Sequence, residues 1–100
     1  MITITPIEIE GVIFTAIQIE LPNTNIFMIS NEIGYIIGST LKLNLEHISR
    51  SHDIIAANVL YANEIEDLLY QPLMTVTKFS SQFYGWEKGM LGKEALLLIA

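Results

Sequence analysis

The first forty residues contain 12 of the chain's 17 isoleucines and none of its five lysine and arginine residues. Their apolar positions recur every second residue: Ile2 and Ile4 share one parity, and Ile7 and Ile9 share the other. β-Branched residues at a period of two favour strands, because successive side chains of a strand point to opposite faces of a sheet. The isoleucine pattern therefore constrains this half of the chain to form a β-sheet.

The same half is predicted to contain two hairpins. Glu10-Gly11 is a turn signal between strands expected at residues 2–10 and 12–20. Pro6 cannot donate a hydrogen bond to a neighbouring strand, so we expect a bend, a bulge or an edge position there. After a loop at residues 21–25, two more strands are expected at residues 26–30 and 35–40, with a turn at residues 31–34.

The second half is predicted to be mainly helical. A nearly continuous apolar stretch predicts one central strand at residues 53–61. Asn63 is a candidate N-cap, Thr75 or Thr77 can cap the next helix, and Gly85 is a natural stop. The spacing of apolar residues predicts short helices at residues 41–49, 63–71, 75–84 and 91–99.

No linker rich in glycine, serine or proline separates the two halves. We therefore expect one domain over residues 1–100 with a single core. Its fold class is predicted to be α+β, with a β-rich N-terminal half of two hairpins plus a fifth strand, packed with about four short helices.

Composition excludes several classes of protein. Hydrophobic residues make up 51% and charged residues 16% of the chain, which is too apolar for a disordered protein. The formal charge of −6 offers no basic stripe for phosphates, so no nucleic-acid partner is expected. Cysteine is absent, which excludes disulfides and thiolate chemistry. No apolar run approaches the ~20 residues of a spanning helix, and the first residues do not form a secretory signal. We expect a cytoplasmic protein with no membrane partner.

The N-terminal hairpin is apolar on both of its faces. A hairpin at the surface would keep one face polar, so the second face must be covered by the chain's own helices or by another subunit. No lysine or arginine opposes a contact between copies in this region. We therefore expect a homo-oligomer, with candidate interface residues Ile4, Ile7, Ile9, Val12, Phe14, Ala16 and Ile17.

A glycine-rich segment before the last helix is the strongest candidate for a ligand site. In Gly89-Met90-Leu91-Gly92-Lys93, free backbone N–H groups and the lysine could bind an anion. The alternative is a tight turn into a helix with Lys93 solvated; the spacing is not that of a P-loop. A site at a cleft between subunits would combine Ser39, Trp86, Gly89, Gly92 and Lys93.

The aromatic residues near the third helix favour a structural interpretation. Val76, Phe79 and Phe83 have helical spacing and are expected to be buried. Trp86 follows Gly85, and a core position or a subunit contact is favoured over a pocket.

The remaining polar residues do not form a catalytic or metal-binding motif. His47 and His52 do not share a helix face, and only Glu46 or Asp53 could join them, so no metal is expected. Ser39 lacks the surroundings of a nucleophilic serine. The acids at positions 64, 66 and 67 lie where a helix N-terminus favours acids in any case. No catalytic residue and no cofactor is predicted, and whether the chain is an enzyme is left open.

Several ordered segments resemble the YunC-like family, a bacterial and archaeal domain family of unknown function. The resemblance covers nearly the whole chain. It implies a small α+β domain that forms homo-oligomers, with a β-rich N-terminal region associated with tetramerisation and no established activity. The segments are Thr5-Pro6-Ile7-Glu8-Ile9-Glu10-Gly11, Leu21-Pro22-Asn23-Thr24-Asn25, Gly34-Tyr35-Ile36-Ile37-Gly38, Ile54-Ile55-Ala56-Ala57, Ile65-Glu66-Asp67-Leu68-Leu69 and Gly89-Met90-Leu91-Gly92-Lys93-Glu94-Ala95-Leu96.

The chain departs from the family's pattern at three positions. Where the pattern more usually has a cysteine, a glycine and then an acid, this chain has Gly38, Ser39 and Lys42. Any chemistry that depends on that cysteine or acid is missing here. The biochemical function is left open. An assembly or interaction role is favoured, and the resemblance makes a tetramer the first state to expect; the alternative is a small-molecule (anion) binding protein or an enzyme with a site at a subunit cleft.

Overall fold

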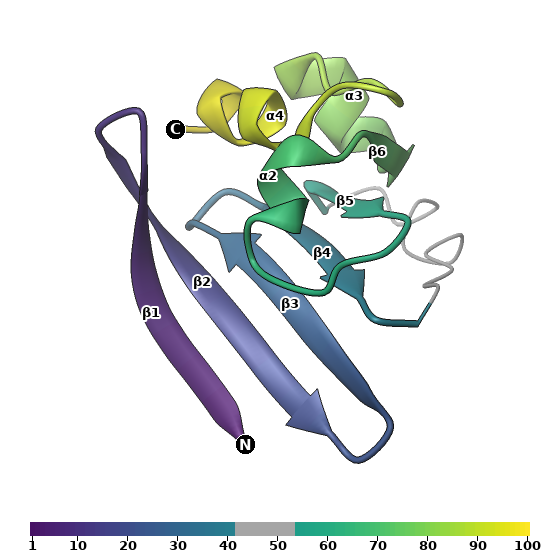
Figure 1. Ribbon diagram of the computed structural model, residues 1–100. Coiled ribbons are helices and arrows are strands. Elements are labelled where there is room, and N and C mark those ends of the chain that lie inside the picture. Colours follow the sequence, from purple (N-terminus) through teal and green to yellow (C-terminus); the bar gives the residue numbers. More distant parts are fainter. Residues whose placement is uncertain (42–53) are drawn as a thin grey trace.

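The computed structural model describes residues 1–41 and 54–100. These residues form one six-stranded sheet whose strands follow each other in chain order, with helices packed against it (Figure 1). All neighbouring strands are antiparallel except β4 and β5, which are parallel. The elements are β1 (Ile2–Ile9), β2 (Val12–Leu21), β3 (Thr24–Ser30), β4 (Tyr35–Ser39), β5 (Ala56–Val59), α2 (Asp67–Tyr70), β6 (Leu73–Val76), α3 (Lys78–Tyr84) and α4 (Gly92–Leu98). The predicted α+β class is confirmed.

The first hairpin forms as the isoleucine alternation predicts. Pairing runs without interruption from Ile2 opposite Ile19 to Ile9 opposite Val12. The two turn residues, Glu10 and Gly11, have φ angles of 50° and 82°. Two positive φ angles match the right-handed twist of a hairpin, and glycine adopts them without steric cost.

Pro6 lies in an edge strand, and the strand has no bulge there. An edge position was one of the three expectations for this proline, beside a bend and a bulge. Among the described strands, β1 pairs with β2 alone, and the register passes unbroken through Pro6 opposite Thr15. Ile2 and Ile4 therefore point to one face of the sheet, while Ile7 and Ile9 point to the other.

The second hairpin is tied to the last helix through Asn31. Its side-chain oxygen accepts hydrogen bonds from the backbone N–H groups of Ile33 and Gly34, which shapes the turn between β3 and β4. Its amide nitrogen donates to the carbonyl of Ile99, 2.8 Å away, at the end of α4. One side chain thus fixes the distance between the sheet and the C-terminal helix.

The core lies between α2, α4 and one face of the sheet. Trp86 is fully buried there, and its indole N–H donates to the carbonyl of Ala95 at 2.8 Å. Of the two positions favoured for this tryptophan, a core position or a subunit contact, the structure shows the core position. The other large buried side chains include Phe14, Phe27, Ile29, Ile36, Leu68, Leu73 and Leu96.

Some predicted elements were wrong in extent. β6 was not predicted: with Thr75 as one of the two candidate caps, the helix could begin before residue 77, whereas Thr77, the other candidate, is the cap and the helix begins at Lys78. The helix expected from Asn63 is the four-residue α2, and Asn63 does not cap it; its backbone N–H donates to Asp67 instead. Three of the four expected helices are found among the described residues, and the one at residues 41–49 lies almost wholly outside them.

The expected apolar face of α3 was also wrong. Phe83 is 62% exposed, and the buried side chain of this helix is Ser80. The reason is a group of hydroxyls at the helix start. Ser80 and Thr77 both accept hydrogen bonds from the backbone N–H of Ala56, and this turns Ser80 inward.

Candidate functional site

One face of the sheet carries two apolar rows that run across the strands. The strand register places Ile4, Ile17, Met28 and Ile37 side by side in one row. The second row lies two residues farther along the strands, toward the β2–β3 turn, and consists of Ile2, Ile19 and Ile26. We call these seven residues the isoleucine face.

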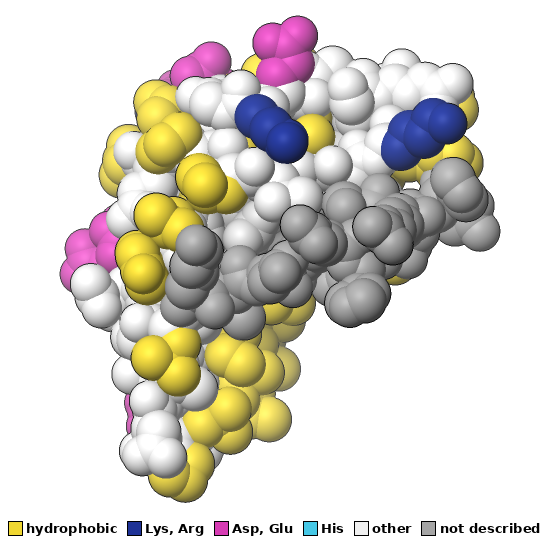
Figure 2. All heavy atoms as spheres, turned by 90° about the vertical axis from the view of Figure 1, so that its right-hand side faces the viewer, with side chains coloured by type: hydrophobic (Ala, Val, Ile, Leu, Met, Phe, Trp, Pro, Cys, Tyr) yellow, Lys and Arg dark blue, Asp and Glu magenta, His cyan; other side chains and the backbone are white. Residues whose placement is uncertain are grey.

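The isoleucine face is opposite to the face that α2 and α4 cover (Figure 1). Ile2 and Ile4 are 64% and 65% exposed, and the other five are half-buried or intermediate in exposure. In Figure 2, hydrophobic side chains gather along the lower part of the molecule, while the lysine side chains that are visible in this view lie in its upper part. The face is a contiguous apolar surface, of the kind that marks an interaction site.

The helix-covered face of the same strands differs from the isoleucine face in its polarity. It carries Phe14 and Ala16 where the helices pack, but Thr3, Thr5 and Gln18 toward the β2–β3 turn, which lies away from the helices in Figure 1. That face therefore becomes polar where the chain's own helices no longer cover it. The isoleucine face remains apolar along the same length.

The structure divides the seven predicted interface residues between the two faces. Ile4 and Ile17 lie on the isoleucine face. Ile9, Phe14 and Ala16 are buried in the chain's own core, which removes them from a contact with another copy. Ile7 and Val12 pack against that core. The sequence shows that both faces are apolar, but it does not show which one the chain's own helices cover.

The glycine-rich segment at residues 89–93 forms a turn in which the backbone N–H groups of both glycines have partners. Gly89, at a φ of 90°, donates to the carbonyl of Leu73, and Gly92 donates to the carbonyl of Gln71. A Cβ at Gly92 would lie 1.7 Å from the carbonyl oxygen of Leu68, so glycine is required for α4 to approach α2. These roles favour the tight-turn interpretation.

Lys93, the predicted anion ligand, is engaged by a carboxylate. Its Nζ lies 2.7 Å from Oε1 of Glu10 in the first hairpin turn. The hydrogen bond from Lys93 and its charge hold the pKa of Glu10 below its ordinary value of 4.5. The same bond and charge raise the pKa of Lys93 above 10.5. The pair ties the hairpin turn to α4.

The other two residues of the predicted ligand site are enclosed. Trp86 has no exposed surface, and its only polar group is used by Ala95. Ser39 is buried at the end of β4, where its hydroxyl donates to the carbonyl of Leu41 and accepts from the N–H of Leu41 at 3.1 Å. Neither side chain offers a free group to a ligand that Lys93 could also reach.

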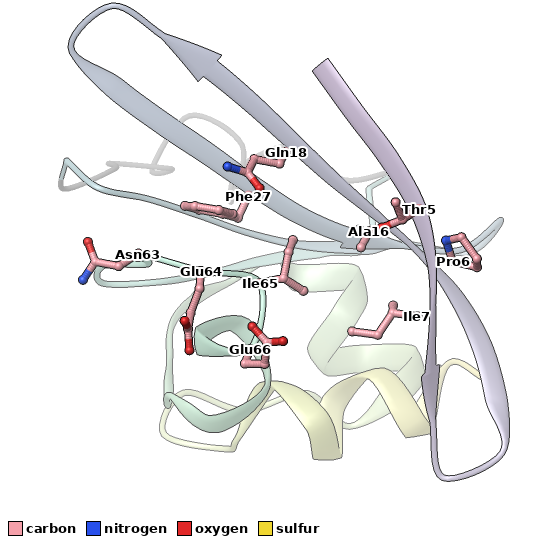
Figure 3. Close-up of a pocket in the computed structure, with 10 residues that line it drawn as sticks. All are labelled: Thr5, Pro6, Ile7, Ala16, Gln18, Phe27, Asn63, Glu64, Ile65 and Glu66. Atoms are coloured by element: carbon pink, nitrogen blue, oxygen red, sulfur yellow. The ribbon is translucent and has the colours of Figure 1, made fainter. Parts of the chain in front are cut away.

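A cavity of about 390 Å³ lies elsewhere, between the polar end of the sheet and the segment before α2 (Figure 3). Figure 3 shows Gln18 and Phe27 on the strand side and Ile65 and Glu66 opposite them. The sequence alone does not reveal this cavity, because its walls come from strands and a loop that are distant in the sequence. Its lining residues are Thr5, Pro6, Ile7, Ala16, Gln18, Phe27, Asn63, Glu64, Ile65 and Glu66.

A second, apolar hollow of about 570 Å³ lies beside α3. Phe79 and Phe83 meet there edge to face, with ring centroids 5.0 Å apart. Ile33, Ile55 and Tyr84 complete its wall.

The position where the family pattern has a cysteine is closely packed in this chain. A Cβ at Gly38 would lie within 3.0 Å of side-chain atoms of Val59, Leu68 and Ala62. Gly38 therefore serves the packing of β4 against its neighbours. Lys42, and the residues of the disfavoured metal site at positions 46, 47, 52 and 53, lie outside the described residues.

Residues 1–41 and 54–100 contain neither a candidate metal site nor a membrane-spanning helix. No group of three histidine, cysteine, aspartate or glutamate residues in these ranges could hold a metal ion. No helix within them is long and apolar enough to cross a membrane.

Comparison with known proteins identifies relatives without a known activity. No protein-family model matches the chain. A crystal structure of a protein of unknown function, TA1206 from Thermoplasma acidophilum, has the same fold, with a TM-score of 0.83 at 22% identity; the match covers 100% of this chain and 94% of that one. The chain is also 38% identical over 98 residues to the uncharacterized protein YunC of Bacillus subtilis (strain 168), a match that covers 97% of this chain and 96% of that protein. The chain belongs to the YunC-like family.

Proposed function

We propose that this protein works as a homo-oligomer, with a tetramer as the first state to expect, and that the assembly itself is its role. The observation that carries the proposal is the isoleucine face, where Ile4, Ile17, Met28 and Ile37 stand in register across four strands. The subunits would stack through this face. Burying such rows against a second sheet is the usual arrangement of two packed sheets.

Charge favours a second copy as the occupant of this face. The chain carries a formal charge of −6, so two copies repel each other wherever their acids meet. The seven residues of the isoleucine face are all uncharged. Two copies can therefore stack there without bringing like charges together.

A pair of lysine substitutions tests the proposal. Met28→Lys places a charge in the middle of the isoleucine face, whereas Phe83→Lys places one at an exposed apolar residue of α3. We expect Met28→Lys to reduce the mass measured by light scattering and Phe83→Lys to leave it unchanged. Circular dichroism of both variants shows whether they remain folded. If Phe83→Lys disrupts the assembly and Met28→Lys does not, the subunits meet at the hollow beside α3 and the proposal is wrong.

The anion-binding alternative has weaker support. Lys93 is paired with Glu10, and the N–H groups of Gly89 and Gly92 already have acceptors. The cavity in Figure 3 contains two glutamates and no lysine or arginine among its lining residues, which opposes an anion there as well.

A further inference from the structure

The first strand has a free edge with few of the features that usually protect one. β1 pairs with β2 on one side and with no other described strand. It is eight residues long, contains no lysine or arginine, and keeps its register without a bulge. Natural edge strands are commonly protected by lysines, bulges or proline, because their unpaired backbone groups accept a strand from another chain.

The hydrogen-bond pattern shows which residues face this edge. Met1 and Glu20 exchange backbone hydrogen bonds in both directions. Bonded and non-bonded pairs alternate along an antiparallel ladder, so the backbone groups of Ile2, Ile4 and Pro6 point away from β2. Pro6 has no N–H to offer, which limits the usable edge to the residues before it.

We propose that β1 pairs antiparallel with β1 of a second copy, with Ile2 opposite Ile4 of the partner subunit and Thr3 on the two-fold axis. This proposal rests on the proposed function, because both require copies of the chain to associate. It adds a second contact, made by the backbone at the sheet edge rather than by side chains on its face.

This register follows from the positions of the outward-facing groups. It joins the N–H and C=O groups of Ile2 and Ile4 to their counterparts in the other copy and leaves Pro6 outside the ladder. A register shifted by one residue on each strand would place Pro6 opposite Ile2 and lose donors on both strands. No charged side chain lies in residues 1–7, so no repulsion opposes the contact.

The same register extends the isoleucine face across the edge. Ile2 and Ile4 point to that face, so Ile4 of the partner subunit would stand beside Ile2 and continue the apolar surface. One copy thus has two self-complementary contacts of different kinds, one at the edge and one on the face. The edge axis is perpendicular to the sheet and the face axis is parallel to it; where these two axes intersect, the two contacts close into an assembly of four copies.

Cysteine substitution tests the register directly, because the natural chain contains no cysteine. In the proposed ladder the two copies of residue 3 form a non-bonded pair with Cα atoms about 4.5 Å apart, within the range of a disulfide. The two copies of residue 5 lie about 13 Å apart along the strands, beyond that range. Thr3 and Thr5 are both exposed threonines of β1, so Thr5→Cys is a matched control.

At micromolar concentration with a mild oxidant, we expect Thr3→Cys to form a covalent dimer and Thr5→Cys to remain mostly uncrosslinked. A dimer from Thr5→Cys alone would show that a different register is used, and a dimer from neither variant would show that the edges do not pair. Either result overturns the proposal.

Adding Met28→Lys to Thr3→Cys separates this proposal from the one about the isoleucine face. If the face contact fails and the edge contact holds, the double variant still gives the covalent dimer. If Met28→Lys alone reduces the mass but Thr3→Cys never crosslinks, the face proposal stands and the edge proposal is wrong.

Discussion

Lys93 and Glu10 show how one charged pair can be mistaken for a ligand site. In the sequence, the lysine follows two glycines at the start of a helix, which is typical of an anion site. In the structure, the glycines shape a turn and the lysine holds the hairpin turn at 2.7 Å. Glu10 and Lys93 are 83 positions apart in the sequence, so no local pattern could predict their contact.

The pair should therefore be visible in the titration of Glu10. Lys93→Gln removes the hydrogen bond and the charge, so we expect the pKa of Glu10 to rise toward 4.5. Carbon-detected NMR of the Glu10 carboxyl in the native protein and the variant measures this pKa. An unchanged pKa would show that the two side chains do not interact in solution.

The direction of the two shifts sets the pH range over which the pair acts. Because the pKa of Glu10 is lowered in the folded chain, its contribution is present above about 4.5 and is lost as the pH falls through the lowered value. Because the pKa of Lys93 is raised, its contribution is present below 10.5 and is lost as the pH rises through the raised value. Salt should weaken the pair, because both groups are exposed to solvent.

Among the strands and helices, those with strong local signals were predicted well. The first hairpin follows from alternation and Glu10-Gly11, and α3 begins after Thr77 and ends at Gly85 with a φ of 72°, as expected. β6 was missed because it is only four residues long. Its identity as a strand depends on its pairing with β5 rather than on its own periodicity.

The candidate site was less predictable than the fold. Ile4 and Ile17 were named for the interface, but their neighbours Ile19, Ile26, Met28 and Ile37 were not. Those residues join the surface only through the register of four strands, and register follows from turn lengths and pairing rather than from local composition. A count of residues between the turns could have identified the rows.

Thr77 joins two elements, which gives a test of how α3 is held. Its hydroxyl accepts from the N–H groups of Ser80 and Ala56 and donates to the carbonyl of Ile54. We expect Thr77→Ala to lower the free energy of unfolding by about 2 kcal/mol, because a helix cap and buried partners are lost together. Thr77→Ser keeps the hydroxyl and should recover most of the stability in urea unfolding. Equal losses in both variants would show that the methyl group matters rather than the hydrogen bonds.

In the molecule as a whole, charge and apolar surface are separated. The five basic residues lie at position 42 or later, and the acid-bearing hairpin turn is held by one of them, Lys93. The seven residues of the isoleucine face are all uncharged, and the first edge strand carries one charged side chain, Glu8, beyond the residues of the proposed ladder. Both surfaces therefore point to contacts between copies of the chain.

The most direct test of this account is the mass of the unmodified protein in solution. One chain has a mass of 11.2 kDa. We expect light scattering over a dilution series down to about 1 μM to give a multiple of that mass, four chains if both contacts form. A mass of one chain at every concentration would contradict the account.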